Sequence, residues 1–175
     1  MEQSARTIEE LEAELAKSRA ETRSAFETRA YMYAYIYEEL VTTIGKDAAI
    51  ALMKRAIYRR GIEVGRKYRP AVEAADLVEV GSIFCNGSPC QGELFEPGIE
   101  ENSNGHIVLR MTSCPLHAAW EGMGLPAEEV DTLCEIAAAV DEGTFAGAGL
   151  DLTFLSRLGA GADKCLLDLQ LPADE

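Results

Sequence analysis

The stretch HIVLRMTSCPLHAAWEGMG, residues 106–124, contains a predicted change from strand to helix. Its first seven residues include β-branched side chains in partial alternation, which favours a strand over 106–112. Cys114 and Pro115 follow, and proline suits the first turn of a helix because its missing N–H has no partner there. We therefore expect a short helix to begin at Pro115 and to end at one of the glycines that follow.

A long helix is predicted before this stretch, over residues 7–44. Apolar and small side chains recur there at steps of three and four residues, which is the helical period. Thr7 and Glu10 have the spacing of a capping box, and Gly45 suits the end of a helix. Because the first half is highly charged, we expect this helix to extend beyond its own domain and to pack on another subunit.

The remaining pattern predicts an α+β protein. We expect a helix over 47–61, a short helix or turn over 71–80, a loop-rich region after residue 80 with a strand at 92–96, a helix from Pro126 to residue 145, and strands at 150–158 and 163–171. The long N-terminal helix and a helical subdomain, residues 1–80, then pack on a small antiparallel sheet with two inserted helices, residues 81–175. Together they are expected to form one compact domain.

Composition excludes several classes of function. The 175 residues carry a net charge of −14, which argues against a nucleic acid partner because phosphates require a basic surface. No apolar run approaches the roughly 20 residues of a membrane span. The polar, acidic N-terminus does not resemble a signal peptide, so we expect a cytoplasmic protein without a membrane partner.

The charge is unevenly distributed along the chain. Residues 46–70 carry eight bases and two acids, a net charge of +6, whereas residues 71–175 carry three bases and nineteen acids, a net charge of −16. A solvated helix face is one interpretation of the basic segment. The other is that Arg59 or Arg60 binds an anionic group of a small substrate.

Several cysteines lie at predicted element ends. Cys114 and His117 are one helical turn apart, and a thiolate and an imidazole at this spacing match divalent metal ligation, above all zinc. Cys134 in a helix or Cys165 in the last strand is a candidate to complete the set. Plain burial is the alternative for each thiol, because buried free cysteines are common and inert.

Two further features have open interpretations. Asp141 lies two helical turns after Cys134 on the same helix face, where a carboxylate can bind metal, act as a general base or simply charge the surface. Cys85 and Cys90 form a C-x4-C pair whose spacing is a poor match to zinc knuckles. Their loop is either an ordinary exposed loop or a lid over a substrate.

Three segments taken together resemble a known family. AAIALMKRAIYRRG, RMTSCPLHAAWEGMGL and LCEIAAAVDEGTFAGAGLDLTFLSRLGAGADKCLLDL are similar to the L-2-amino-thiazoline-4-carboxylic acid hydrolase family, with a resemblance over about residues 30 to 170. The resemblance implies a small α+β domain that opens a cyclic isothiourea to N-carbamoyl-cysteine. The family's motif positions are occupied here by Cys114, Trp120, Cys134, Asp141 and Cys165.

The implied reaction gives these residues expected roles. Ring opening needs an activated water, and a bound zinc ion lowers the pKa of its water to about 7. We expect Cys114 and Cys165, with His117 or Cys134, to hold zinc, and Asp141 to transfer protons. Arg59, Arg60 or Arg110 is expected to bind the carboxylate of a small anionic or zwitterionic substrate, next to Trp120.

Two alternatives remain open at this stage. In one, the chain is a binding or scaffold protein whose cysteines form a structural metal site or a plain core. In the other, no metal is involved and Cys114 is the nucleophile, because a helix N-terminus lowers the pKa of a thiol. In each case we expect a homo-oligomer, from the long first helix.

Overall fold

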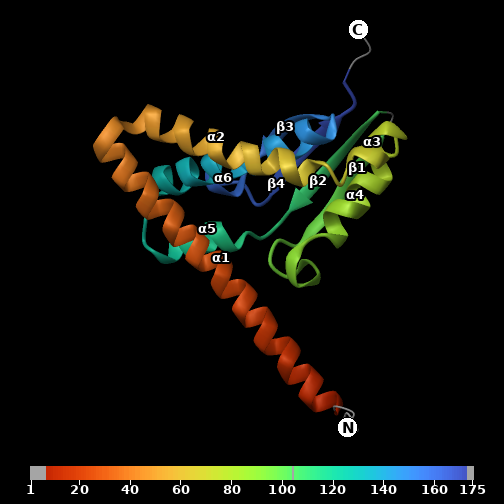
Figure 1. The fold of residues 1–175 in the computed structure, drawn as a ribbon, viewed down its shortest axis with the longest axis horizontal. Coiled ribbons are helices and arrows are strands. Elements are labelled where there is room, and N and C mark those ends of the chain that lie inside the picture. The colour runs from red at the N-terminus through yellow and green to blue at the C-terminus, as the bar shows by residue number, and fades with distance from the viewer. Residues whose placement is uncertain (1–6, 104, 173–175) are drawn as a thin grey trace.

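The computed structural model describes residues 7–103 and 105–172. Its elements are six α-helices, two short 3-10 helices and one four-stranded antiparallel sheet, which confirms the predicted α+β class (Figure 1). Residues 1–6 lie outside the described residues. They belong to the polar N-terminus from which a cytoplasmic protein is expected. No helix of the described part is both long enough and apolar enough to cross a membrane.

Helix α1 spans Ile8–Ile44, as its periodicity predicts. The capping box is present: the Thr7 N–H donates to Glu10 Oε2 at 2.8 Å, and the Glu10 N–H donates to Thr7 Oγ1 at 3.2 Å. Gly45 ends the helix with a φ of 85°, a value that glycine adopts without strain. These local signals are strong enough to fix both ends of the helix.

Helix α2 spans Lys46–Gly65 and is longer than the predicted helix over 47–61. Gly61 does not end it, because this glycine faces α6 (Ala127–Ala148) rather than solvent. A Cβ at Gly61 would lie 2.3 Å from the Val140 carbonyl oxygen. The glycine is therefore present for close helix packing and not for termination.

The predicted loop-rich region after residue 80 is wrong in its first part. Helix α4 spans Leu77–Asn86, after a one-turn helix α3 at Arg69–Glu73. The apolar face of α4 packs on the sheet so closely that a Cβ at Gly81 would lie 2.7 Å from Ile99 Cδ1. Burial of this face stabilises a helix that its serine and glycine content does not favour.

The predicted strand at 92–96 is also wrong. That segment follows the 3-10 turn η1 at Pro89–Gly92, and strand β1 begins only at Pro97 and runs to Ser103. The other strands are β2 at His106–Met111, β3 at Asp151–Ser156 and β4 at Cys165–Gln170. The order in the sheet is β1-β2-β4-β3, and a further 3-10 turn, η2 at Leu158–Ala160, connects β3 to β4.

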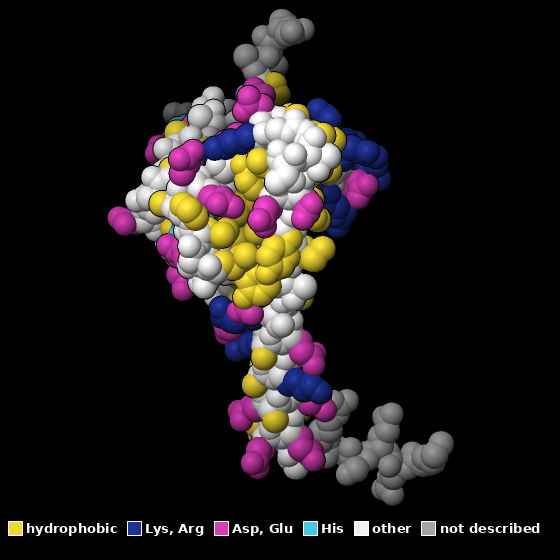
Figure 2. Space-filling view, turned by 90° about the vertical axis from the view of Figure 1, so that its left-hand side faces the viewer, with side chains coloured by type: hydrophobic (Ala, Val, Ile, Leu, Met, Phe, Trp, Pro, Cys, Tyr) yellow, Lys and Arg dark blue, Asp and Glu magenta, His cyan; other side chains and the backbone are white. Residues whose placement is uncertain are grey.

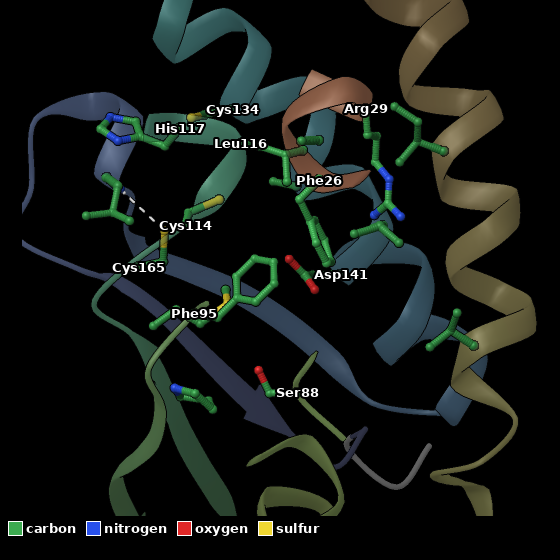
Figure 3. Close-up of a pocket in the computed structure, with 18 of the residues that line it drawn as sticks. Phe26, Arg29, Ser88, Phe95, Cys114, Leu116, His117, Cys134, Asp141 and Cys165 are labelled. Carbon is green, nitrogen blue, oxygen red and sulfur yellow. Dashed lines mark hydrogen bonds between the residues drawn. The ribbon is translucent and has the colours of Figure 1, made fainter. Parts of the chain in front are cut away.

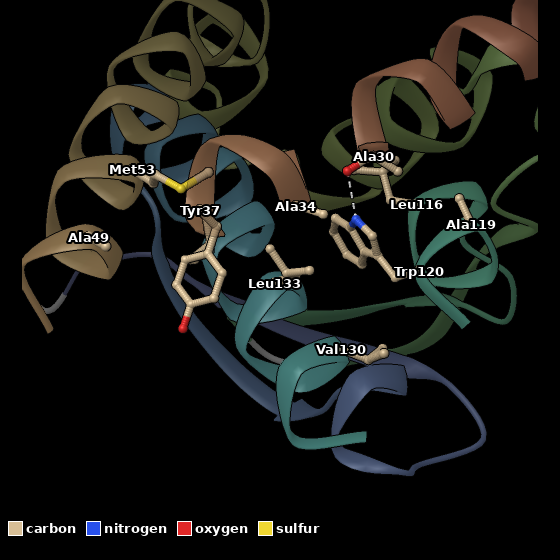
Figure 4. Close-up of a cluster of buried hydrophobic side chains, with 11 residues drawn as sticks. Ala30, Ala34, Tyr37, Ala49, Met53, Leu116, Ala119, Trp120, Val130 and Leu133 are labelled. Atoms are coloured by element: carbon tan, nitrogen blue, oxygen red, sulfur yellow. Dashed lines mark hydrogen bonds between the residues drawn. The ribbon is translucent and has the colours of Figure 1, made fainter. Parts of the chain in front are cut away.

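Helix α5 spans Pro115–Gly122 and follows β2, as predicted, while α6 is a longer helix than the one predicted to residue 145. Between β2 and β3 these two helices form the insertion. Trp120 of α5 is fully buried, and its indole N–H donates to the Ala30 carbonyl oxygen at 2.8 Å (Figure 4). This contact fixes α5 against α1 in a core that also includes Leu133 and Ile136 of α6.

The N-terminal part of α1 extends away from the body of the molecule (Figure 1). On this arm, residues 8–20, apolar side chains lie among acidic and basic ones (Figure 2). Ile8, Leu11 and Leu15 are 76, 49 and 48% exposed. They continue the apolar stripe with which the later part of α1 packs on the body. A helical segment as short as residues 8–20 is only marginally stable in water when nothing packs against it.

We propose that the homodimer expected from the sequence forms through this arm, with a second copy of the chain packed against its exposed apolar side chains. We expect Leu11→Glu combined with Leu15→Glu to convert a dimer into a monomer in analytical ultracentrifugation. Leu155→Glu is the matched control, since Leu155 is 56% exposed on β3 and should not affect association. A wild-type chain that sediments as a monomer at every concentration would contradict the proposal.

Candidate functional site

A cavity of about 740 Å³ lies between α1, α2, α5, α6 and one end of the sheet. The segment between α4 and β1 closes part of it through Ser88 and Phe95 (Figure 3). Most of the wall is apolar, and its large side chains include Phe26, Ile57, Phe84, Phe95, Leu116 and Phe154. Phe26 and Phe95 meet edge to face, with ring centroids 5.3 Å apart, and join α1 to the loop.

Asp141 of α6 is the carboxylate in this cavity (Figure 3). Asp141 is deeply buried, although the cavity beside it leaves part of the residue accessible. It forms no hydrogen bond or ion pair with another described residue. Burial raises the pKa of Asp141 to about 7, and the charge of Glu142 adds to the rise. A carboxyl with this pKa exchanges protons at neutral pH.

Three cysteines line the same cavity. Strand pairing explains two of them: β2 ends at Met111 opposite Cys165, and Cys114 follows three residues later. Cys134 comes from α6 and lies under the turn between β3 and β4, where a Cβ at Gly159 would be 2.7 Å from its Sγ. The tertiary structure thus brings together thiols that are 20 or more residues apart in the sequence.

These thiols are protonated at neutral pH. Burial raises the pKa of Cys114, and the backbone N–H groups of His117 and Leu116 oppose that rise without reversing it. Burial likewise raises the pKa of Cys134, to about 12, and that of Cys165, whose Sγ accepts a hydrogen bond from the Leu158 N–H at 3.4 Å. All five cysteines of the chain are free.

His117 lines the cavity, and its Nδ1 lies 3.4 Å from Glu121 Oε2, one turn along α5. The predicted zinc ligands Cys114, His117, Cys134 and Cys165 therefore share one cavity. Within the part of the chain that the structure describes, however, no three His, Cys, Asp or Glu side chains are arranged to hold a metal ion. The donor geometry does not fit zinc, which stays a prediction.

The arginines expected to bind substrate are dispersed. Arg60 lines the cavity, but its Nη1 pairs with Glu63 Oε2 at 2.8 Å and its side chain is largely exposed. Arg59 lies in a separate shallow depression with Tyr58. Arg110 is outside the cavity and pairs with Glu100 at 3.6 Å.

Trp120 was also expected to contact substrate. It is one of the residues around the cavity, but its side chain is fully buried in the hydrophobic core. Cys85 and Cys90 are both absent from the cavity wall. The loop that contains Cys90 does reach the cavity through Ser88, Pro89 and Phe95, and its interpretation as a lid stays a prediction.

Sequence reasoning missed four polar residues of the cavity. Arg29 lies over the Phe26 ring at 4.6 Å, and Lys67 lies over the Tyr68 ring at 4.9 Å. Arg157 donates to Asp131 Oδ1 at 2.9 Å, and Ser88 comes from the loop. Lys67 belongs to the basic segment 46–70, which was the available signal, but nothing in the sequence separates it from its neighbours.

Comparison with known proteins gives one family match and one similar fold. The model of a family described as L-2-amino-thiazoline-4-carboxylic acid hydrolase matches residues 23–168. The fold is similar to that of trafficking protein particle complex subunit 3 from Naegleria fowleri, whose crystal structure is of the protein covalently bound to palmitic acid; the identity is 13%, the match covers 83% of this chain and 96% of that chain, and the TM-score is 0.50. No curated protein matches the sequence significantly.

Proposed function

Because this chain belongs to the L-2-amino-thiazoline-4-carboxylic acid hydrolase family, we propose that it is a hydrolase that opens a small cyclic amidine-like substrate in the cavity. The family name gives the reaction class, and L-2-amino-thiazoline-4-carboxylate is the proposed substrate. Asp141 is the observation that carries the proposal. It is a carboxyl with a pKa of about 7 and no described partner, placed in a mostly apolar cavity of a size suited to a small molecule.

In the proposed reaction Asp141 carries a proton from the attacking water to the leaving sulfur. The ionised carboxylate removes a proton from water while the water oxygen bonds to the ring carbon between sulfur and nitrogen. The tetrahedral intermediate then breaks its carbon–sulfur bond, and the sulfur takes the proton from Asp141. The protonated amidine already holds the proton that the product nitrogen keeps, so the hydroxyl proton passes to solvent water as the carbonyl forms, and the product contains a thiol and a carbamoyl group, as in N-carbamoyl-cysteine.

Charged and titratable groups around Asp141 set its proton affinity. Glu142 lies next to it on α6, while Tyr68, Cys114 and Cys165 face it from other elements and interact with its charge. None of these groups is a cation. The surroundings therefore favour the protonated carboxyl, which suits a group that must return its proton to a leaving sulfur.

A nucleophilic Cys114 is the less favoured route to the same products. Burial holds the pKa of Cys114 above its ordinary value, so the reactive thiolate is scarce at neutral pH. A zinc-activated water has no support from the described donor geometry, and no step of the proposed reaction uses a metal.

The ring-opening reaction is tested directly by thiol release. Purified protein is incubated with L-2-amino-thiazoline-4-carboxylate, and a thiol reagent measures the new thiol, with mass spectrometry identifying the product. Catalytic amounts of enzyme keep the protein's own cysteines negligible. An absence of release above the uncatalysed rate would overturn the proposed activity.

A second candidate function is the binding of an acyl chain. The apolar wall and the buried Cys114 thiol favour it, and the similar trafficking-complex subunit was solved with palmitic acid covalently attached. In that case the cavity would hold an acyl group, for example as a thioester of Cys114, and the chain would be a binding protein rather than an enzyme.

Mass spectrometry of the purified wild type and of Cys114→Ser separates these possibilities. We expect the intact mass to match the unmodified chain under denaturing conditions and native conditions to show no zinc that depends on Cys114, because neither is required by the Asp141 route. An adduct of acyl mass on the wild type alone would favour the binding protein. One zinc ion per chain, lost in the variant, would instead restore the metal hypothesis.

A further inference from the structure

Ser88 has a hydroxyl group that lacks a partner. Its Oγ exposes less than 1 Å² and forms no hydrogen bond to any described residue, although Ser88 lines the cavity. Figure 3 shows this hydroxyl pointing into the cavity from the side opposite the helix that carries Asp141. Buried hydroxyl groups almost always have a hydrogen-bond partner, so an unpartnered one facing a cavity indicates a group that a ligand completes.

Lys67 provides a cation next to Gly87, the residue before Ser88. Its Nζ lies 3.0 Å from the position that a Cβ on Gly87, the residue before Ser88, would occupy. The ammonium group also lies 4.9 Å from the centre of the Tyr68 ring. It forms no ion pair with a described carboxylate, in a chain with 30 acidic and 16 basic residues. An ammonium without a described carboxylate partner, next to the residue that precedes an unpartnered hydroxyl, is a site for an anionic oxygen.

The cavity therefore has donors and an acceptor in different places. Lys67 and Ser88 come from the segments before α3 and after α4, while Asp141 comes from α6. We propose that Lys67 and Ser88 bind the carboxylate of a zwitterionic ligand and that Asp141 faces its cationic, amidine-like end. This inference rests on the proposed function for the identity of the ligand.

Other cations in the cavity are less suited to this role. Arg157 already pairs with Asp131 at 2.9 Å, and Arg60 pairs with Glu63 at 2.8 Å. Arg29 also has no described carboxylate partner; it comes from α1, lies over the Phe26 ring and interacts with Tyr33. Arg29 is therefore the rival that the experiment must include.

The experiment uses a ligand that the enzyme cannot hydrolyse. In thiazolidine-4-carboxylate the carbon between sulfur and nitrogen is a saturated CH₂ instead of an amidine carbon, while the five-membered ring, the ring nitrogen and the carboxylate are kept. Its carboxamide keeps the ring and the nitrogen without the negative charge. Isothermal titration calorimetry measures the affinity of both compounds for the wild type and for Lys67→Gln, Ser88→Ala, Arg29→Gln and Arg66→Gln. Arg66→Gln is the matched control, because Arg66 adjoins Lys67 and does not line the cavity.

We expect Lys67→Gln to weaken binding of the carboxylate by about 10- to 100-fold and Ser88→Ala by about 5- to 10-fold, from the usual contribution of charged and neutral hydrogen bonds. Lys67→Gln should not change the affinity for the carboxamide, whereas Ser88→Ala should weaken it as well, because an amide oxygen also accepts a hydrogen bond from the hydroxyl. Arg66→Gln should bind both compounds as the wild type does. Unchanged thermal unfolding would show that the variants are folded.

Several outcomes would overturn the proposal. They are a wild type that binds neither compound or binds both equally, a Lys67→Gln variant that behaves like Arg66→Gln, and a loss of carboxylate preference in Arg29→Gln alone. Failure of the proposed function is a separate result. A wild type that shows the expected binding pattern but releases no thiol from the thiazoline would keep the carboxylate site and reject the reaction.

Discussion

Asp141→Asn is expected to lower kcat/KM for thiazoline ring opening by about 10²- to 10⁴-fold, the usual contribution of a positioned general base. Asparagine has nearly the same shape but cannot accept the proton of the attacking water. The measurement is thiol release over a range of substrate concentrations. A variant that retains half of the wild-type activity would remove Asp141 from the mechanism.

The pH dependence of the rate is an independent test of Asp141. The wild-type rate should rise with pH through about 7, because burial raises the pKa of Asp141 to about 7 and only the ionised form acts as a base. The residual rate of Asp141→Asn should not show this rise. Glu142→Gln is the matched control: it should remain active, with the midpoint moved to lower pH, since the charge of Glu142 contributes to the raised pKa.

Stability measurements separate a catalytic loss from misfolding. The pKa of Asp141 is 3.8 as a reference and about 7 in the folded chain, so between these values the folded state retains a proton that the unfolded state loses. Stability therefore falls as pH rises through this window, and the penalty is fully present above pH 7. It corresponds to roughly 4 kcal/mol as an upper bound. Asp141→Asn should thus be more stable than the wild type at pH 8, with the difference vanishing near pH 3.

Gly143→Ala is expected to destabilise the fold by about 3 kcal/mol or more, at the upper end of the range for inserting a methyl group into a closely packed contact. A Cβ at Gly143 would lie 2.1 Å from the Tyr58 carbonyl oxygen, and backbone cannot move aside as a flexible side chain can. Helices α2 and α6 would have to separate. The cavity would change with them, because both helices contribute to its wall.

Chemical denaturation measures this effect, and Gly122→Ala is its matched control. Gly122 also lies in a helix, but a Cβ there would meet nothing within 4 Å. Alanine also favours a helix more than glycine does, so the control variant should be as stable as the wild type or slightly more stable. Equal stability of Gly143→Ala and Gly122→Ala would show that the contact between α2 and α6 is not as close as the structure has it.

The sequence by itself determined the elements whose signals are local. The capping box of Thr7 and Glu10 and the glycine at 45 fixed both ends of α1, and Pro115 placed the start of α5. Alternation gave β2. Each of these signals acts within a few residues, so it can be read without knowing what the element packs against.

The tertiary structure decided the elements that depend on distant partners. Helix α4 contains Ser82 and Gly81 and looks like loop, and it is helical because Leu77 and Val80 pack on the sheet. Gly61 looks like a helix end, yet α2 continues past it because α6 lies against its bare Cα. In both cases burial against a remote element outweighs local propensity.

For the candidate site as well, some residues could be identified from the sequence and others only from the tertiary structure. Helical and strand spacing could place Cys114, His117 and Asp141 as residues of interest, since the helix period relates positions a turn apart. It could not bring Lys67 and Ser88 together, because their proximity arises from the packing of separate segments around one cavity. The raised pKa of Asp141 has the same origin: burial by surrounding elements is its main cause, and no property of the neighbouring sequence alone produces it.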